Sequence, residues 1–157
     1  LRELEGLVQI YMPDFKYTDS ALALRYSAAP DYPEIARAAI FEMFRQGGPF
    51  ELDDDGMLRS GVLLRHLILP GAEDNSRAVI DFVADNFPGD DILFSLMAQY
   101  TPMPDTERFP ELRKTVTAEE NDMLIEYMTQ RGIYNGFWQE PCSATDDMIP
   151  DFDLTGV

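Results

Sequence analysis

The sequence predicts an α/β fold in which parallel strands form an open sheet joined by crossover helices. Three stretches of nearly continuous hydrophobicity are typical of strands that are covered on both faces. Segments with helical spacing of apolar residues lie between them, and this alternation favours a parallel sheet. With 157 residues, 45% of them hydrophobic, the chain is long enough to form one domain with a substantial core.

The predicted strands cover residues 7–12, 61–69 and 92–100, and a weaker candidate covers residues 133–138. Each of the first three is followed within two residues by a proline, which cannot donate a hydrogen bond to a sheet. We therefore expect each of these strands to end at that point.

The predicted helices cover residues 33–46, 76–86 and 117–131. Asp31 is a candidate cap for the first helix, and Pro33 suits its first turn. Thr117 and Glu120 have the spacing of a capping box at the start of the third. Glycines follow the first and third helices, as is common at helix ends.

An acidic insertion interrupts the alternation at residues 50–58, where an Asp-Gly pair predicts a small hairpin. Glu51, Asp53 and Asp55 also match the first, third and fifth positions of an EF-hand calcium loop, with Gly56 at the sixth. The twelfth position needs a bidentate glutamate but holds Val62. The sequence therefore favours a turn over a calcium site.

The formal net charge of −17 repels phosphate backbones and anionic lipids, so nucleic acid and membrane surfaces are not expected partners. The sequence contains no apolar run of about 20 residues that would span a bilayer. Cys142 is the single cysteine, so no disulfide can form within the chain, and a reduced, cytoplasmic setting is expected.

The segment 1–6 reads as the end of a helix and its glycine stop, so we expect the chain to be a fragment or a processed product. Residues 1–140 are expected to form the folded unit, and residues 141–157 an acidic tail. The sequence does not decide whether this tail covers the surface or a partner site.

Ligands of parallel α/β sheets collect at the carboxyl ends of the strands. Asp14 and Lys16 follow the first strand two residues apart, so in an extended chain they point to the same side. They could hold a zwitterionic ligand or form a local ion pair. Arg65 lies inside a run of aliphatic residues and needs a partner, either a structural acid or an anionic ligand.

His66, the only histidine, should point away from Arg65, and we expect it to be a hydrogen-bonded structural residue. Gln99 and Tyr100 end the third strand and could line a pocket together with Met97, although plain core positions are favoured for the methionine and the tyrosine. Paired metal ligands on a helix and a glycine-rich phosphate loop are both absent from the sequence.

Three segments in this order, residues 11–16, 26–32 and 64–71, resemble the later half of radical-SAM proteins homologous to pyruvate formate-lyase activating enzymes. The similarity extends over about residues 8–138. It implies a partial (β/α)6 TIM-like barrel, to which this chain would contribute the fourth strand onward.

The resemblance also implies functional residues. Lys16 would contact the methionyl carboxylate of S-adenosylmethionine, and Asp14 with the backbone carbonyl of Met12 would help to bind a monovalent cation. Arg65 would face the cofactor. Gln99 and Tyr100 stand where the activating enzymes have a histidine near the cofactor.

The motif Cys-x3-Cys-x2-Cys, which holds the [4Fe-4S] cluster of this family, is absent from the chain. In the family the cluster cleaves S-adenosylmethionine to a 5′-deoxyadenosyl radical, which takes a hydrogen atom from a glycyl-radical or other protein substrate. We therefore expect the chain alone to be inactive and to bind neither cofactor stably. The strand at residues 7–12 should be an edge or be covered by another chain.

Two other interpretations remain open. The chain could be an acidic α/β module that binds a small molecule or a protein without redox chemistry. It could also be a degenerate homologue that uses the mouth of the barrel as a protein-interaction surface.

Overall fold

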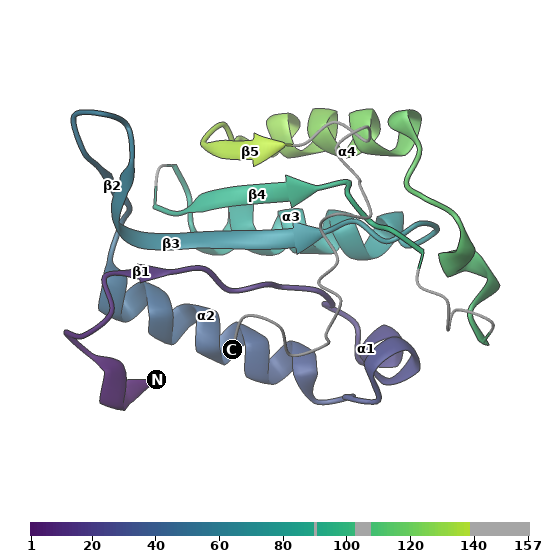
Figure 1. Cartoon of the computed structure of the whole chain (residues 1–157), viewed down its shortest axis with the longest axis horizontal. Helices are drawn as coiled ribbons and strands as arrows, with labels where there is room; N and C mark the ends of the chain where they lie inside the picture. The colour runs from purple at the N-terminus through teal and green to yellow at the C-terminus, as the bar shows by residue number, and fades with distance from the viewer. Residues whose placement is uncertain (90, 103–107, 139–157) are drawn as a thin grey trace, which may run out of the picture.

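The computed structural model describes residues 1–89, 91–102 and 108–138, so the predicted tail at residues 141–157, with Cys142, lies outside the described residues. The fold is α/β, with a parallel sheet and helices (Figure 1). The strands are β1 (Ile10–Tyr11), β2 (Glu51–Leu52), β3 (Leu58–Leu67), β4 (Leu93–Met97) and β5 (Gly136–Trp138). The helices are α1 (Ser20–Ser27), α2 (Tyr32–Gly47), α3 (Glu73–Asn86) and α4 (Ala118–Gln130), with short 3-10 turns η1 (Arg2–Leu4) and η3 (Pro110–Arg113).

The parallel strands lie side by side in chain order, β1-β3-β4-β5. The register pairs Tyr11 with Val62 and Arg65 with Ser95, and Ser95 in turn pairs with Phe137. β1 and β5 are the two ends of this order, so β1 is an edge among the described strands, as the sequence predicts.

Helices α2, α3 and α4 form a layer on one face of the sheet (Figure 1). The ring of Phe41 on α2 lies 5.7 Å from that of Phe82 on α3, and the hydroxyl of Tyr127 on α4 donates to Asp81 on α3 at 2.7 Å. Right-handed crossovers between parallel strands that advance in one direction place all helices on the same side of a sheet. The apolar core lies between this layer and the sheet.

Side chains of β3 alternate between the two faces of the sheet, as in any strand. Val62 and Leu64 are fully buried against the helices, whereas Leu63 and Leu67 are only partly buried on the opposite face. That opposite face, which we call the inner face, also carries Arg65.

The sheet differs from the predicted strands mainly at their ends. The strand predicted for residues 7–12 is reduced to β1 (Ile10–Tyr11), and the chain then touches β3 again through a bridge between Asp14 and Arg65. β3 begins earlier than predicted, at Leu58, because its first residues form the hairpin with β2. β4 and β5 are shorter than predicted because pairing with their neighbours covers only residues 93–97 and 136–138.

The predicted hairpin is confirmed. β2 pairs antiparallel with the start of β3, and the carboxylate of Asp53 accepts from the backbone N–H groups of Asp55 and Met57. Gly56 completes the turn with a φ of +77°. The Asp53 carboxylate therefore stabilises a turn, in agreement with the interpretation that the sequence favours.

The predicted helices are confirmed with small shifts, and α3 begins three residues earlier than predicted. The capping box of Thr117 and Glu120 is complete. Asp31 precedes α2 as expected, but its side chain makes no capping hydrogen bond, so that part of the prediction is wrong. α1 was not predicted from the sequence; the Asp19 carboxylate caps it by accepting from the backbone of Ala21 and Leu22.

Among the described helices, none is both long enough and apolar enough to cross a membrane.

Candidate functional site

The ion pair between Asp14 and Arg65 joins the end of β1 to β3 on the inner face. Arg65 Nε donates to Asp14 Oδ1 at 2.8 Å, and the side chains of Arg65 and Asp14 are 36% and 34% exposed, respectively. The backbones of the same region also pair, because the Arg65 N–H donates to Pro13 and the Phe15 N–H donates to Arg65. Of the two partners that the sequence allows for Arg65, a structural acid and an anionic ligand, the structure supplies the acid.

The neighbours of Arg65 on the inner face are mixed in character. Ser95 lies beside it on β4, and Leu67 and Met97 form the next pair toward the carboxyl ends. Ser95 is buried, whereas Met97 is half-buried. The pair of charges thus has polar and apolar neighbours, and because both side chains are about a third exposed, solvent screens the attraction between them.

Beyond its backbone bridge to Arg65, the segment after β1 is held by side chains from other elements. The Tyr32 hydroxyl, on α2, accepts from the Lys16 N–H and donates to the Asp14 carbonyl, both at 2.9 Å. Asn75, on α3, donates to the Lys16 carbonyl at 2.9 Å and accepts from the N–H and hydroxyl of Thr18. Burial raises the pKa of Tyr32, which keeps this hydroxyl protonated and able to donate.

His66 fixes the same segment from the opposite side of β3. Its ring is fully buried, with Nδ1 2.8 Å from the Phe15 carbonyl and Nε2 2.9 Å from Oγ of Ser76. The carbonyl can only accept, so Nδ1 carries the proton and Nε2 accepts from the serine hydroxyl. Burial lowers the pKa of His66 to about 4, so the ring is neutral at pH 7. The histidine is a structural, hydrogen-bonded residue, as the sequence predicts.

Lys16 is exposed at the carboxyl end of β1, two residues beyond Asp14. Within the part of the chain that the structure describes, its ammonium group forms no ion pair or hydrogen bond, while the Asp14 carboxylate is engaged by Arg65. The structure thus brings Asp14 and Arg65 together and leaves the Lys16 ammonium able to receive an anion.

Gln99 and Tyr100 point to different environments. The Tyr100 ring packs in the core and its hydroxyl donates to the Leu112 carbonyl at 2.9 Å, so it is committed to structure. Gln99 follows β4, and its Oε1 atom is buried without a hydrogen bond to any described residue. A buried acceptor without a donor is costly. Of the two, Gln99 is therefore the residue that a ligand donor would stabilise.

Three residues with long-range anchoring contacts are not predicted from the sequence. Tyr32 and Asn75 are the anchors of the Lys16 segment, and Glu111 of η3 binds both Arg25 and the Tyr26 hydroxyl. Tyr32 lies in one of the segments that carry the family resemblance, which was a usable signal. Nothing in the local sequence marks Asn75, because its partners are 57 and 59 residues away.

The residues fit the two implied cofactors differently. A [4Fe-4S] cluster needs three or more thiolates, and the chain has one cysteine, so this chain does not hold such a cluster by itself. No group of three or more His, Cys, Asp and Glu side chains suited to a metal occurs within residues 1–89, 91–102 and 108–138. In chemical type, an ammonium such as that of Lys16 can bind a carboxylate, and an amide oxygen such as that of Gln99 can accept from an amine, the two charged groups of an amino acid.

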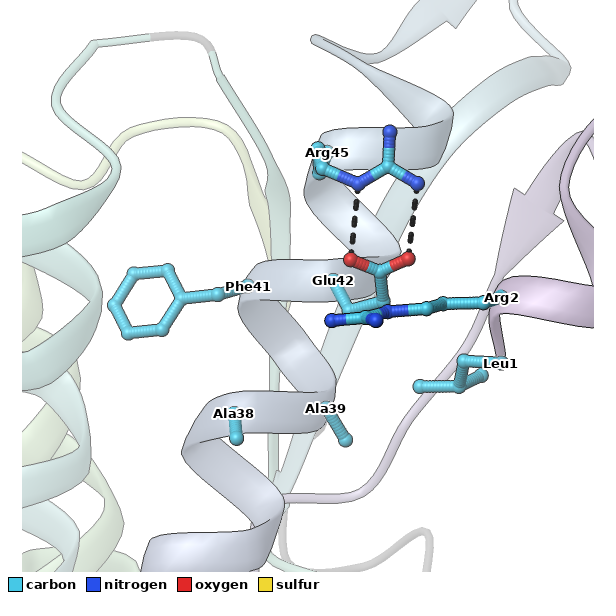
Figure 2. Close-up of a pocket in the computed structure, with 7 residues that line it drawn as sticks. All are labelled: Leu1, Arg2, Ala38, Ala39, Phe41, Glu42 and Arg45. Carbon is cyan, nitrogen blue, oxygen red and sulfur yellow. Dashed lines mark hydrogen bonds and ion pairs between the residues drawn. The ribbon is translucent and has the colours of Figure 1, made fainter.

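A separate hollow of about 640 Å³ lies against the outer side of α2, walled by the N-terminal residues (Figure 2). Two of its charged groups are matched to each other: Arg45 binds the Glu42 carboxylate through two nitrogens, each at 2.9 Å, and also reaches Glu5. Hydrogen bonds from Arg45 and Gln46 lower the pKa of Glu42 to about 2. None of the residues that line this hollow belongs to the segment from Asp14 to Thr18.

No protein family matches the sequence, and no solved structure matches it either. The chain is similar to the uncharacterized protein MJ0674 of Methanocaldococcus jannaschii, with 25% identity over 124 residues, which is 78% of this chain and 32% of that protein. The chain thus spans about a third of the length of this relative.

Proposed function

We propose that this chain is the S-adenosylmethionine carboxylate side of a radical-SAM enzyme resembling the pyruvate formate-lyase activating enzymes. The observation that carries the proposal is the segment Asp14-Phe15-Lys16 at the carboxyl end of β1, in which Lys16 is exposed, has an ammonium group unpaired among the described residues, and follows Asp14 of the Asp14–Arg65 ion pair by two positions. Lys16 would bind the methionyl carboxylate, and Arg65 and Gln99 would face the same ligand.

The arrangement of the strands supports a section of a (β/α)6 barrel wall. Parallel strands in chain order, with their helices on one face, are what a barrel contains, and in such a barrel the inner face becomes the interior. Parallel sheets are usually covered on both faces. Further strands of a longer protein would cover the inner face and protect the edge at β1.

Asp14 would have two roles in this site, as the partner of Arg65 and as a ligand of a cation. As a partner of Arg65 it fixes the guanidinium on the inner face. As a cation ligand, together with the Met12 carbonyl, it would share its carboxylate between Arg65 and the ion, and a carboxylate can accept from more than one partner. When bound, the [4Fe-4S] cluster would supply the electron that cleaves the cofactor, with its thiolates provided from outside this chain.

The full-length protein encoded by the gene tests this function. Purified without oxygen and reconstituted with iron and sulfide, it should bind about four iron atoms per chain and cleave S-adenosylmethionine reductively. Replacing Lys16 with glutamine should weaken S-adenosylmethionine binding about tenfold or more, because a charge-assisted hydrogen bond is lost. Lys114→Gln, at the chain's other lysine, is the matched control.

The competing function is an acidic α/β module that binds a ligand without redox chemistry. A full-length protein that binds no iron would favour that module, and S-adenosylmethionine affinity that is equal in Lys16→Gln and in the wild type would overturn the assignment of Lys16. Reductive cleavage by the isolated 157-residue chain would contradict the view that it carries only part of the site.

A further inference from the structure

The backbone of Lys16 is hydrogen-bonded at both its N–H and its carbonyl by residues of two different helices. The Tyr32 hydroxyl of α2 binds its N–H and the Asn75 amide of α3 binds its carbonyl, each at 2.9 Å. Asn75 is 95% buried, and its oxygen also accepts from the N–H and hydroxyl of Thr18. Each residue from Asp14 to Thr18 except Tyr17 therefore has at least one backbone N–H or C=O group hydrogen-bonded to a residue of another element.

This bonding is unusual for a segment outside the sheet ladder. Such a loop normally takes its hydrogen bonds from water and is mobile. Here the side chain of Lys16 remains exposed while its peptide groups are fixed on both sides. The fixed backbone sets the position and direction of the Lys16 Cα–Cβ bond, so an anion that binds the ammonium group has only the side-chain torsions left to restrict.

We propose that Tyr32 and Asn75 are positioning residues, which aim the Lys16 ammonium at the carboxylate of the bound ligand. The inference rests on the proposed function and deepens it, because it assigns the carboxylate selectivity of the site to two residues that do not touch the ligand. A precise first contact held by a second layer of hydrogen bonds is the arrangement that strong and selective sites use.

The test compares S-adenosylmethionine with its decarboxylated analogue, using equilibrium dialysis with the full-length reconstituted protein. Tyr32→Phe removes only the hydroxyl, and Asn75→Leu removes the amide at similar volume. Each should weaken S-adenosylmethionine about tenfold and leave the affinity for the decarboxylated analogue within about twofold. Lys16→Met should abolish the preference for the carboxylate, and adding Tyr32→Phe to it should have no further effect.

Two matched controls make the same chemical changes elsewhere. Tyr127→Phe removes a hydroxyl that donates to Asp81, and Asn86→Leu removes an amide that donates to the Phe82 carbonyl. Both should keep the wild-type preference for the carboxylate. Thermal unfolding of all variants identifies any that fail to fold. If either Tyr32→Phe or Asn75→Leu does not fold, the other variant still tests the proposal.

Each outcome is decisive. Equal weakening of both ligands, an unchanged preference for the carboxylate, or a further loss in the Lys16→Met background would overturn the positioning role while leaving the proposed function standing. A wild-type protein that binds neither ligand would overturn the proposed function, and the positioning role with it. Selective loss of S-adenosylmethionine binding supports both.

Discussion

Arg65 and Asp14 are joined twice, once by their side chains at 2.8 Å and once by the backbone bridge between β3 and the segment after β1. The two residues are 51 positions apart in the chain, so the contact joins the segment after β1 to the carboxyl half of β3. Its contribution to stability can be measured without a ligand.

Replacing Arg65 with methionine should lower the free energy of unfolding by about 0.5–1 kcal/mol, because partly exposed ion pairs contribute little. A double-mutant cycle with Asp14→Asn, followed by urea denaturation, measures the coupling between the two side chains. Arg59→Met, at an exposed position of the same strand, is the control. A coupling well above about 1 kcal/mol would contradict the solvent-screened pair described above.

His66 should make the protein acid-sensitive. Burial lowers its pKa in the folded state from 6.5 to about 4, so as the pH falls through this window the unfolded chain binds the proton first. The free energy of unfolding should therefore fall by roughly 3 kcal/mol between pH 6.5 and pH 4 from this residue.

Urea unfolding at several pH values in wild type and His66→Gln isolates that contribution. The carboxylates with lowered pKa, among them Glu42, also reduce stability at acid pH, but they do so equally in both proteins. The difference between the two curves should shrink by the predicted amount as the pH falls. Parallel curves would show that the histidine is not buried in its neutral form.

Gly61 should be intolerant of any side chain. It has a φ of +111°, and a Cβ atom there would lie 2.5 Å from Cα of Phe50, a backbone atom that cannot give way cheaply. Gly61→Ala should cost roughly 3 kcal/mol or more. Gly89→Ala is the control, because Gly89 also has a positive φ, of +74°, but has open space around it, so only about 1 kcal/mol of strain is expected. Equal losses of stability in the two variants, measured by thermal denaturation, would contradict the close approach of the Phe50 backbone to Gly61.

The capping box at α4 should contribute measurably to stability. The Thr117 hydroxyl accepts from the Glu120 N–H, and the Glu120 carboxylate accepts from the Thr117 N–H at 2.7 Å. Thr117→Ala should lower the free energy of unfolding by about 1 kcal/mol. Thr115→Ala, at an exposed position two residues earlier, should leave chemical denaturation almost unchanged.

The sequence predicted the elements whose signals are local. Continuous apolar runs located β3 and β4, helical spacing located α2 and α3, and the Thr117–Glu120 spacing located the start of α4. The strand ends were less accurate, because β1 is limited by how far β3 pairs with it, and that is a property of the fold. α1 was missed although Asp19, its cap, was present as a signal.

The sequence predicted which residues belong to the candidate site, but it predicted only some of the contacts between them. Asp14, Lys16 and Arg65 were recognised from their places at strand ends, yet spacing alone could not decide whether Arg65 meets an acid or a ligand. The anchoring role of Asn75 could not be predicted, because its partners are brought to it only when α3 packs behind β3. Contacts over such sequence distances depend on the completed fold.

The order β1-β3-β4-β5 also bears on how the protein is made. Each parallel strand pairs with the parallel strand that precedes it in the chain, so its partner has already left the ribosome when it emerges. The sheet can therefore be extended one strand and one helix at a time during synthesis. A fold whose strand order doubled back would have to wait for later segments before its central strands could pair.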